Sequence, residues 1–136
     1  MKRLTATVMV TVAVAAALAL APAVLGAAGL TGTYSGKLAT KVAKNATLNG
    51  TWKLTFAAGG KYTIARNGVS LIHGTAAFAS GGKITFGHES GPAACPASEP
   101  GSYRYAVNGK TLSFSLVKDT CTGRLAVLTL VTYKHV

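Results

Sequence analysis

Few residues of this chain could carry out chemistry, and the best candidates lie close together. His88 and Glu89 are adjacent, and with His73 they could form a metal site or an acid–base pair. Neighbouring residues on an extended chain point to opposite sides, and no second pair of metal ligands stands at a useful spacing. The motifs of serine hydrolases, zinc metalloproteases, phosphate-binding loops and dinucleotide-binding folds are missing. We therefore expect no enzymatic activity, no cofactor and no metal.

Cysteine chemistry offers a second possibility, because the chain has two cysteines, Cys95 and Cys121. Two are too few for a four-ligand zinc site. In an exported protein a disulfide between them is the default, and two free buried thiols are the alternative. The disulfide would close a loop of about 27 residues, which is worth roughly 3.5 kcal/mol in the chain-entropy model. We expect the Cys95–Cys121 disulfide.

The overall charge is strongly positive. The 136 residues include 14 Lys and Arg but only 3 Asp and Glu, for a formal net charge of +11. The length allows one domain. With 49% hydrophobic and 12% charged residues, the chain is not a disordered polyelectrolyte. Three carboxylates leave little material for carboxylate chemistry.

The N-terminus has the parts of a secretory signal peptide. Lys2 and Arg3 precede an apolar stretch from Thr5 to Leu20, and small residues such as Ala23 and Ala28 follow. We therefore expect a signal peptide over residues 1–28, a mature domain over 29–136, and a secreted or cell-envelope location. Because the uncharged run exceeds the roughly 20 residues needed to cross a bilayer, a retained N-terminal membrane anchor is the alternative.

After residue 30, short alternating runs of apolar and polar residues lie between glycine and Asn-Gly turns, a pattern that predicts β-strands. Eight strands are expected over about residues 32–40, 51–57, 61–66, 69–79, 83–87, 102–107, 110–117 and 124–133. The longest loop, residues 88–101, holds three of the four prolines. The last strand is nearly all apolar, so alternation does not show which of its residues face inward.

Eight consecutive strands with mostly short connections predict an all-β fold, most economically an eight-stranded antiparallel up-and-down barrel with no exposed edge. A β-sandwich is the alternative. In a barrel of this topology alternate loops share an end, so the loops that hold Cys95 and Cys121 lie together and can be joined. The opposite end is closed by tight glycine turns, so we expect the mouth at the cysteine end.

Several motifs resemble those of small secreted bacterial lipocalin-like proteins of the calycin type. They are residues 50–56 (GTWKLTF), residues 101–105 (GSYRY), residues 121–124 (CTGR) and the loop sequence of residues 86–95. The resemblance covers about residues 30–134 and implies a secreted β-barrel. In lipocalins the Trp of the G-x-W element packs under an arginine of the last strand. Trp52 and Arg124 match those positions, so the resemblance implies a cation–π contact between them.

The aromatic residues alternate to one side of the expected strands, where they either line a pocket for an apolar ligand or fill the core. The residues that we expect to contact a ligand, at the inward positions and around the mouth, are Trp52, Phe56, Tyr62, Phe86, His88, Glu89, Tyr103, Tyr105 and Arg124. Glu89 and Arg124 could also pair with each other at the mouth, which would be a structural role.

The basic residues are scattered over strands and turns and form no run. A nucleic-acid site would combine a basic stripe with exposed aromatic residues, so we expect no nucleic acid as a partner. An anionic envelope polymer or a lipid surface is a more plausible counterpart for a basic protein outside the cell. We expect a monomer.

We therefore expect a secreted, non-enzymatic, lipocalin-like protein that binds a small apolar or amphipathic ligand. The alternative is a protein-interaction module, such as a secreted protease-inhibitor barrel. An interior pocket above roughly 300 Å³ would favour the ligand. A filled barrel with an exposed apolar patch of several hundred Å² would favour the protein partner.

Overall fold

The structure is a computed structural model that describes residues 29–136. The expected signal peptide or membrane anchor over residues 1–28 lies outside the described residues. Within residues 29–136, no helix is long and apolar enough to cross a membrane.

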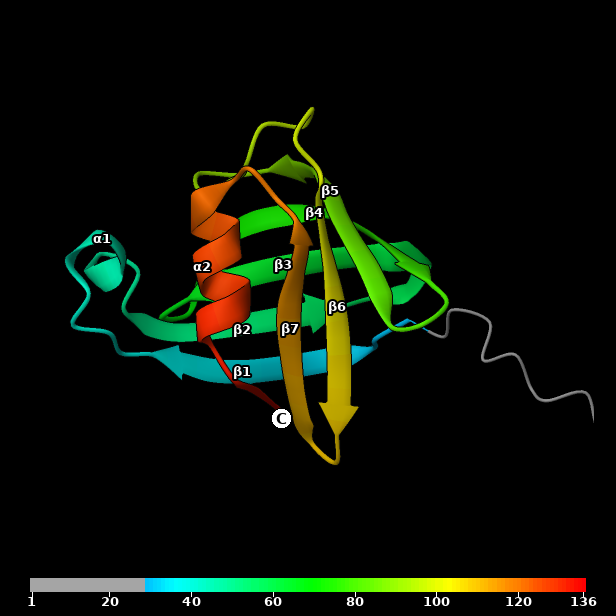
Figure 1. The fold of residues 1–136 in the computed structure, drawn as a ribbon, viewed down its shortest axis with the longest axis horizontal. Coiled ribbons are helices and arrows are strands. Elements are labelled where there is room, and N and C mark those ends of the chain that lie inside the picture. Colours follow the sequence, from blue (N-terminus) through cyan, green and yellow to red (C-terminus); the bar gives the residue numbers. More distant parts are fainter. Residues whose placement is uncertain (1–28) are drawn as a thin grey trace, which may run out of the picture.

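Eight antiparallel strands close a barrel in the order in which they occur along the chain (Figure 1). They are β1 (Gly32–Leu38), β2 (Gly50–Phe56), β3 (Lys61–Arg66), β4 (Val69–Ala79), β5 (Lys83–Ser90), β6 (Gly101–Asn108), β7 (Thr111–Lys118) and β8 (Tyr133–His135). The short β8 pairs with both β7 and β1 and so completes the closure. The all-β up-and-down barrel is confirmed, and the β-sandwich alternative is excluded.

Helices interrupt the meander at three places, namely α1 (Ala43–Ala46), the 3-10 turn η1 (Ala58–Gly60) and α2 (Thr122–Leu130). The prediction of one strand over residues 124–133 was therefore wrong, since α2 occupies most of that segment and β8 only its end. The buried positions Arg124, Val127, Leu128 and Val131 explain the helix. Their spacing of three and four residues is that of a helical face, and α2 packs beside β7 over the barrel end.

The barrel core follows the alternation that was expected of the strands. Inward positions such as Leu54, Ile64, Ile84 and Leu112 are fully or almost fully buried. Phe86 lies at the centre of a set of aromatic rings, with ring centroids 5.0 Å from Tyr62, 5.8 Å from Tyr103 and 5.8 Å from Phe114. These edge-to-face contacts fill the middle of the barrel.

At the barrel end that holds the two cysteines, strand β5 is longer than predicted. Strand β5 continues to Ser90, so His88 and Glu89 belong to a strand and not to the loop after it. A register shift between His73 and Thr75 on β4 accompanies this extension. Cys95 and Cys121 form the expected disulfide, with their Cα atoms 6.1 Å apart. The disulfide joins the loop after β5 to the start of α2.

Candidate functional site

Arg124, in the first turn of α2, is buried between two carboxylates. Its Nη1 donates to Oε1 of Glu89 over 2.9 Å. Its Nε donates to Oδ2 of Asp119 over 2.6 Å, and its Nη2 donates to Oδ1 of Asp119 over 2.8 Å. Nη2 also donates to the backbone carbonyl of Glu99 over 2.7 Å. One guanidinium thus connects β5, the loop before β6 and the segment before α2. The expected pairing of Glu89 with Arg124 is confirmed.

Two inward tyrosines donate to the same carboxylates. The phenol of Tyr62, on β3, donates to Oε1 of Glu89 over 2.5 Å. The phenol of Tyr103, on β6, donates to Oδ2 of Asp119. Each buried carboxylate therefore accepts bonds from a guanidinium and from a phenol, so its oxygens have partners inside the barrel.

The disulfide joins this network through its backbone. The N–H of Cys95 donates to Oε2 of Glu89 over 2.7 Å, and the N–H of Cys121 donates to Oδ1 of Asp119 over 2.8 Å. Both cysteine loops are thus held by a carboxylate as well as by the sulfur bond. Among residues 29–136, every buried side-chain nitrogen or oxygen has a hydrogen-bond partner.

The pKa shifts follow from these contacts. Burial alone would raise the pKa of Asp119, but hydrogen bonds from Arg124, Tyr103 and the Cys121 N–H outweigh it and hold the pKa below its ordinary 3.8. Burial, and then the hydrogen bond to Glu89, raise the pKa of Tyr62 far above its ordinary 10. Burial and the bond to Asp119 do the same for Tyr103. Asp119 is thus held as a charge and the two phenols are held neutral, an arrangement suited to a structural clamp.

The barrel interior is largely filled by its own side chains. A cavity of about 60 Å³ lies at the α2 end of the barrel. It is lined by Leu48, Trp52, Ile64, Ile72, Ala93, Gly123, Arg124 and Val127. This cavity is well below the roughly 300 Å³ at which small-molecule sites begin.

Because the interior is filled, most of the residues that we expected to contact a ligand are buried in the core. Phe56, Tyr62, Phe86 and Tyr103 are at most 4% exposed, and they pack against one another in the core. Tyr105 is half-buried, with its ring edge-to-face against Phe78 at 5.9 Å. A contact between these residues and a ligand stays a prediction, and their burial among other side chains does not favour it.

Trp52 has a different cationic partner from the one that the resemblance implied. The guanidinium carbon of Arg66, not that of Arg124, lies over its ring, 5.7 Å from the centroid. Arg66 is the register partner of Trp52 across β2 and β3. The indole Nε1 donates to the carbonyl of Leu48 over 2.8 Å. Arg124 is engaged by two carboxylates instead, because α2 carries it into the barrel end.

His88 and Glu89 point apart, as expected for neighbours on a strand. His88 is exposed and adopts a left-handed φ of 50°, whereas Glu89 is buried in the network. In the part of the chain that the structure describes, no three side chains of His, Cys, Asp or Glu gather in a way that could hold a metal ion.

A further hollow, a groove, lies outside the barrel. It lies between residues 44–48 and α2, next to one another in Figure 1, and has a volume of about 600 Å³. Its lining residues are Lys44, Asn45, Thr47, Leu48, Thr122, Gly123, Leu125, Ala126, Thr129 and Leu130. The groove could not be predicted from the strand pattern, because α2 forms one of its walls. Residues 124–133 are nearly all apolar, so their sequence carries no signal that distinguishes a helix from a strand or that assigns Leu125 to an outer face.

Comparisons of the chain with protein-family models, with curated proteins and with solved structures find no match. The likeness to lipocalin-like proteins therefore rests on the closed eight-stranded barrel itself.

Proposed function

We propose that the chain is an exported, non-enzymatic binding protein that holds a single-chain amphipathic anion, such as a fatty acid, in the groove between residues 44–48 and α2. The groove volume of about 600 Å³ carries the proposal. It falls within the roughly 300 to 1,000 Å³ of small-molecule sites, whereas the cavity inside the barrel end offers about 60 Å³.

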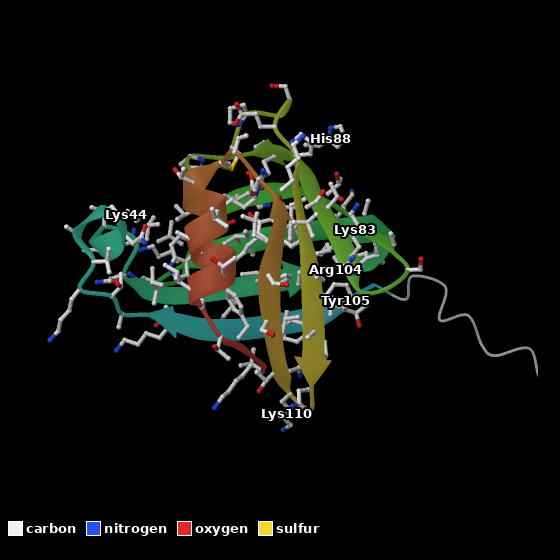
Figure 2. The ribbon with its side chains drawn as sticks, in the orientation of Figure 1. Lys44, Lys83, His88, Arg104, Tyr105 and Lys110 are labelled. Carbon is white, nitrogen blue, oxygen red and sulfur yellow. A yellow bond between two sulfur atoms is a disulfide. The ribbon has the colours of Figure 1, made fainter. Side chains whose placement is uncertain are left out.

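The chemistry of the groove suits a ligand with an apolar tail and an anionic head. Leu48, Leu125 and Leu130 supply aliphatic surface for the tail. Lys44, which Figure 2 shows on α1, supplies a cation at the rim. Asn45 is a further hydrogen-bonding group on the same wall.

The groove and the small inner cavity share lining residues, so binding in the groove should be detectable by tryptophan fluorescence. Leu48 and Gly123 line both the groove and the small inner cavity. Trp52, the one tryptophan of the chain, lines that cavity and donates to the Leu48 carbonyl. A ligand that contacts Leu48 should therefore change the fluorescence of Trp52.

Export is supported by two features. The Cys95–Cys121 disulfide suits an oxidising compartment. The first 28 residues have the composition of a signal peptide.

A protein-interaction module is the second candidate, and the filled barrel favours it. The groove could instead accept an apolar side chain from a protein partner. Val42 and Leu130, at 54% and 50% exposure, are large apolar residues that a partner could cover. A protease inhibitor would act in this way, as a rigid surface.

A titration with dodecanoate below its micelle concentration tests the proposal. The protein is recovered from an exporting host with its disulfide intact. We expect saturable binding with a change in Trp52 fluorescence, and at least a tenfold weaker affinity for Leu130→Glu. Val107→Glu is the matched control, because Val107 is 49% exposed and does not line the groove.

No saturable binding, or equal weakening by both variants, would overturn the fatty-acid proposal. If Leu130→Glu instead abolishes the capture of a protease while dodecanoate does not bind, the inhibitor function is the correct one.

A further inference from the structure

The buried network removes two of the three acids from the protein surface. Glu89 and Asp119 are paired with Arg124, and the side chains of all three are at most 1% exposed. Residues 29–136 contain twelve Lys and Arg, so eleven remain outside this network against one acid, Glu99. The fold therefore makes the outer surface more cationic than the composition of the chain alone suggests.

Part of this charge is concentrated on the outer face of β5, β6 and β7. Lys83 and Arg104 are register partners across β5 and β6, and both are exposed (Figure 2). The next outward pair on these strands is Thr85 with Ser102, and Ser102 is in turn the partner of Lys118 on β7. Like charges opposite one another destabilise a sheet. Among the described residues, ion pairs are formed only by Arg124, so none of these three cations is paired with an acid.

Two shallow hollows lie on the same face. One, of about 200 Å³, is lined by Thr75, Ala76, Ala77, Thr85, Gly87, His88 and Pro100. The other, of about 280 Å³, is lined by Ser98, Glu99, Pro100, Ser102, Lys118 and Thr120. They share Pro100 and meet where the hydroxyls of Thr85 and Ser102 lie 3.2 Å apart. We call the two hollows together the hydroxyl trough. It has His88 in one half and Lys118 in the other.

We propose that the hydroxyl trough and the adjoining Lys83–Arg104 pair bind a linear anionic polysaccharide. Lys118 in the trough and the Lys83–Arg104 pair beside it would meet the sulfate, phosphate or carboxylate groups that recur along such a chain. The hydroxyls of Thr85 and Ser102 can donate to these anions and to sugar hydroxyls. This surface is separate from the fatty-acid groove, and the inference does not rest on the proposed function.

The side chains around the trough favour a polysaccharide over two other polyanions. The outward residues next to the Lys83–Arg104 pair are small, such as Ala77, Ala79 and Ser115, and Leu116 and Val117 on β7 are the large exposed apolar residues nearest in sequence to Lys118. Two aliphatic side chains give a bilayer much less to hold than the apolar face of an interfacial helix does. Tyr105, the neighbour of Arg104 on β6, packs its ring against Phe78, which leaves the His88 imidazole as the one ring in the trough lining that could stack on a nucleic-acid base.

The test measures binding of dextran sulfate, with neutral dextran of the same length as the negative control. We expect Lys83→Gln/Arg104→Gln to weaken binding at least tenfold. Lys37→Gln/Lys53→Gln is the matched control, because both lysines are exposed on the paired strands β1 and β2, across the barrel, and the same charge is lost. It should weaken binding by less than threefold.

A third variant tests the trough itself. Glu99 is the one acid that lines it, so Glu99→Gln should strengthen binding of dextran sulfate about two- to threefold. Unchanged thermal unfolding of each variant confirms that its fold is intact. Equal losses for the two double variants would reduce the effect to net charge and overturn the site. Tighter binding of duplex DNA or of anionic vesicles, with the same dependence on Lys83 and Arg104, would overturn the assignment to a polysaccharide.

Discussion

The guanidinium of Arg124 lies 2.9 Å from the carboxylate of Glu89, although the two residues are 35 positions apart in the sequence. Glu89 is near the end of β5 and Arg124 is in the first turn of α2, so this contact fastens the helix to the barrel. The disulfide between Cys95 and Cys121 joins the loop after β5 to the N-cap of α2. One end of the barrel is thus held both covalently and by buried charges.

Replacing Arg124 by Met should strongly destabilise the fold. The variant would leave the carboxylates of Glu89 and Asp119 buried without a counter-charge. Breaking a buried ion pair in this way costs about 3–5 kcal/mol. We expect a loss of that size in the free energy of unfolding, measured by urea denaturation. Arg104→Met, on the exposed face of β6, is the control and should change it by less than about 0.5 kcal/mol. A similarly small loss for Arg124→Met would show that the network contributes little.

Acid should weaken the same network through Asp119. Its pKa is lower in the folded protein than in the unfolded chain, where it is about 3.9. The stability that Asp119 contributes is therefore fully present above about pH 4 and is lost as the pH falls toward the lower folded value. We expect Asp119→Asn to be less stable than the natural protein at pH 7, but to lose less stability between about pH 4 and pH 2. Urea midpoints at several pH values test this, and parallel pH profiles of the two proteins would contradict it.

Removing the disulfide should cost stability through the unfolded state. Cys95 and Cys121 are 26 residues apart, and closing a loop of this length is worth about 3.5 kcal/mol in the chain-entropy model. Cys95→Ala/Cys121→Ala should lower the free energy of unfolding by up to that amount. Excess dithiothreitol should destabilise the natural protein to a similar extent and leave the variant unchanged. A reductant effect of equal size on both proteins would point to a different cause.

The strands were predictable where inward and outward residues alternate and glycine turns mark the ends. The segments 61–66 and 69–79 have the predicted bounds. Helix α2 was not predicted, because residues 124–133 are nearly all apolar. In such a run the two-residue period of a strand cannot be distinguished from the 3.6-residue period of a helix. The groove depends on α2 and was missed with it.

The network was predictable only in part. Glu89 and Arg124 could be paired from the topology, which brings the ends of β5 and β7 together. Asp119 gave no signal of its own, since an aspartate in a turn before a cysteine is usually solvated. The resemblance to lipocalin-like proteins implied that Arg124 is the cation above the Trp52 ring. In the structure that cation is Arg66, the register partner of Trp52 across β2 and β3.

Replacing glycine by alanine should have opposite effects on stability at two positions, Gly101 and Gly123. Gly101 is buried beside the network, and a Cβ atom there would collide with the Asp119 carboxylate and come within 2.8 Å of Nε of Arg124. Gly101→Ala should therefore destabilise the protein by about 1–3 kcal/mol, as overpacking does in other cores. Gly123 lies in α2, and a Cβ atom added to it would have no neighbour within 4 Å. Gly123→Ala should stabilise the protein by about 0.5–1 kcal/mol, because glycine inside a helix costs that much relative to alanine.

Urea denaturation of the two alanine variants provides the comparison, and each serves as the control for the other. Both substitutions add one methyl group at the same end of the barrel, but only the methyl group of Gly101→Ala meets the carboxylate of Asp119. If Gly101→Ala unfolds within about 0.5 kcal/mol of the natural protein, the carboxylate and the Arg124 guanidinium can move apart at little cost. A rigid clamp at the start of β6 would then be the wrong description of this network.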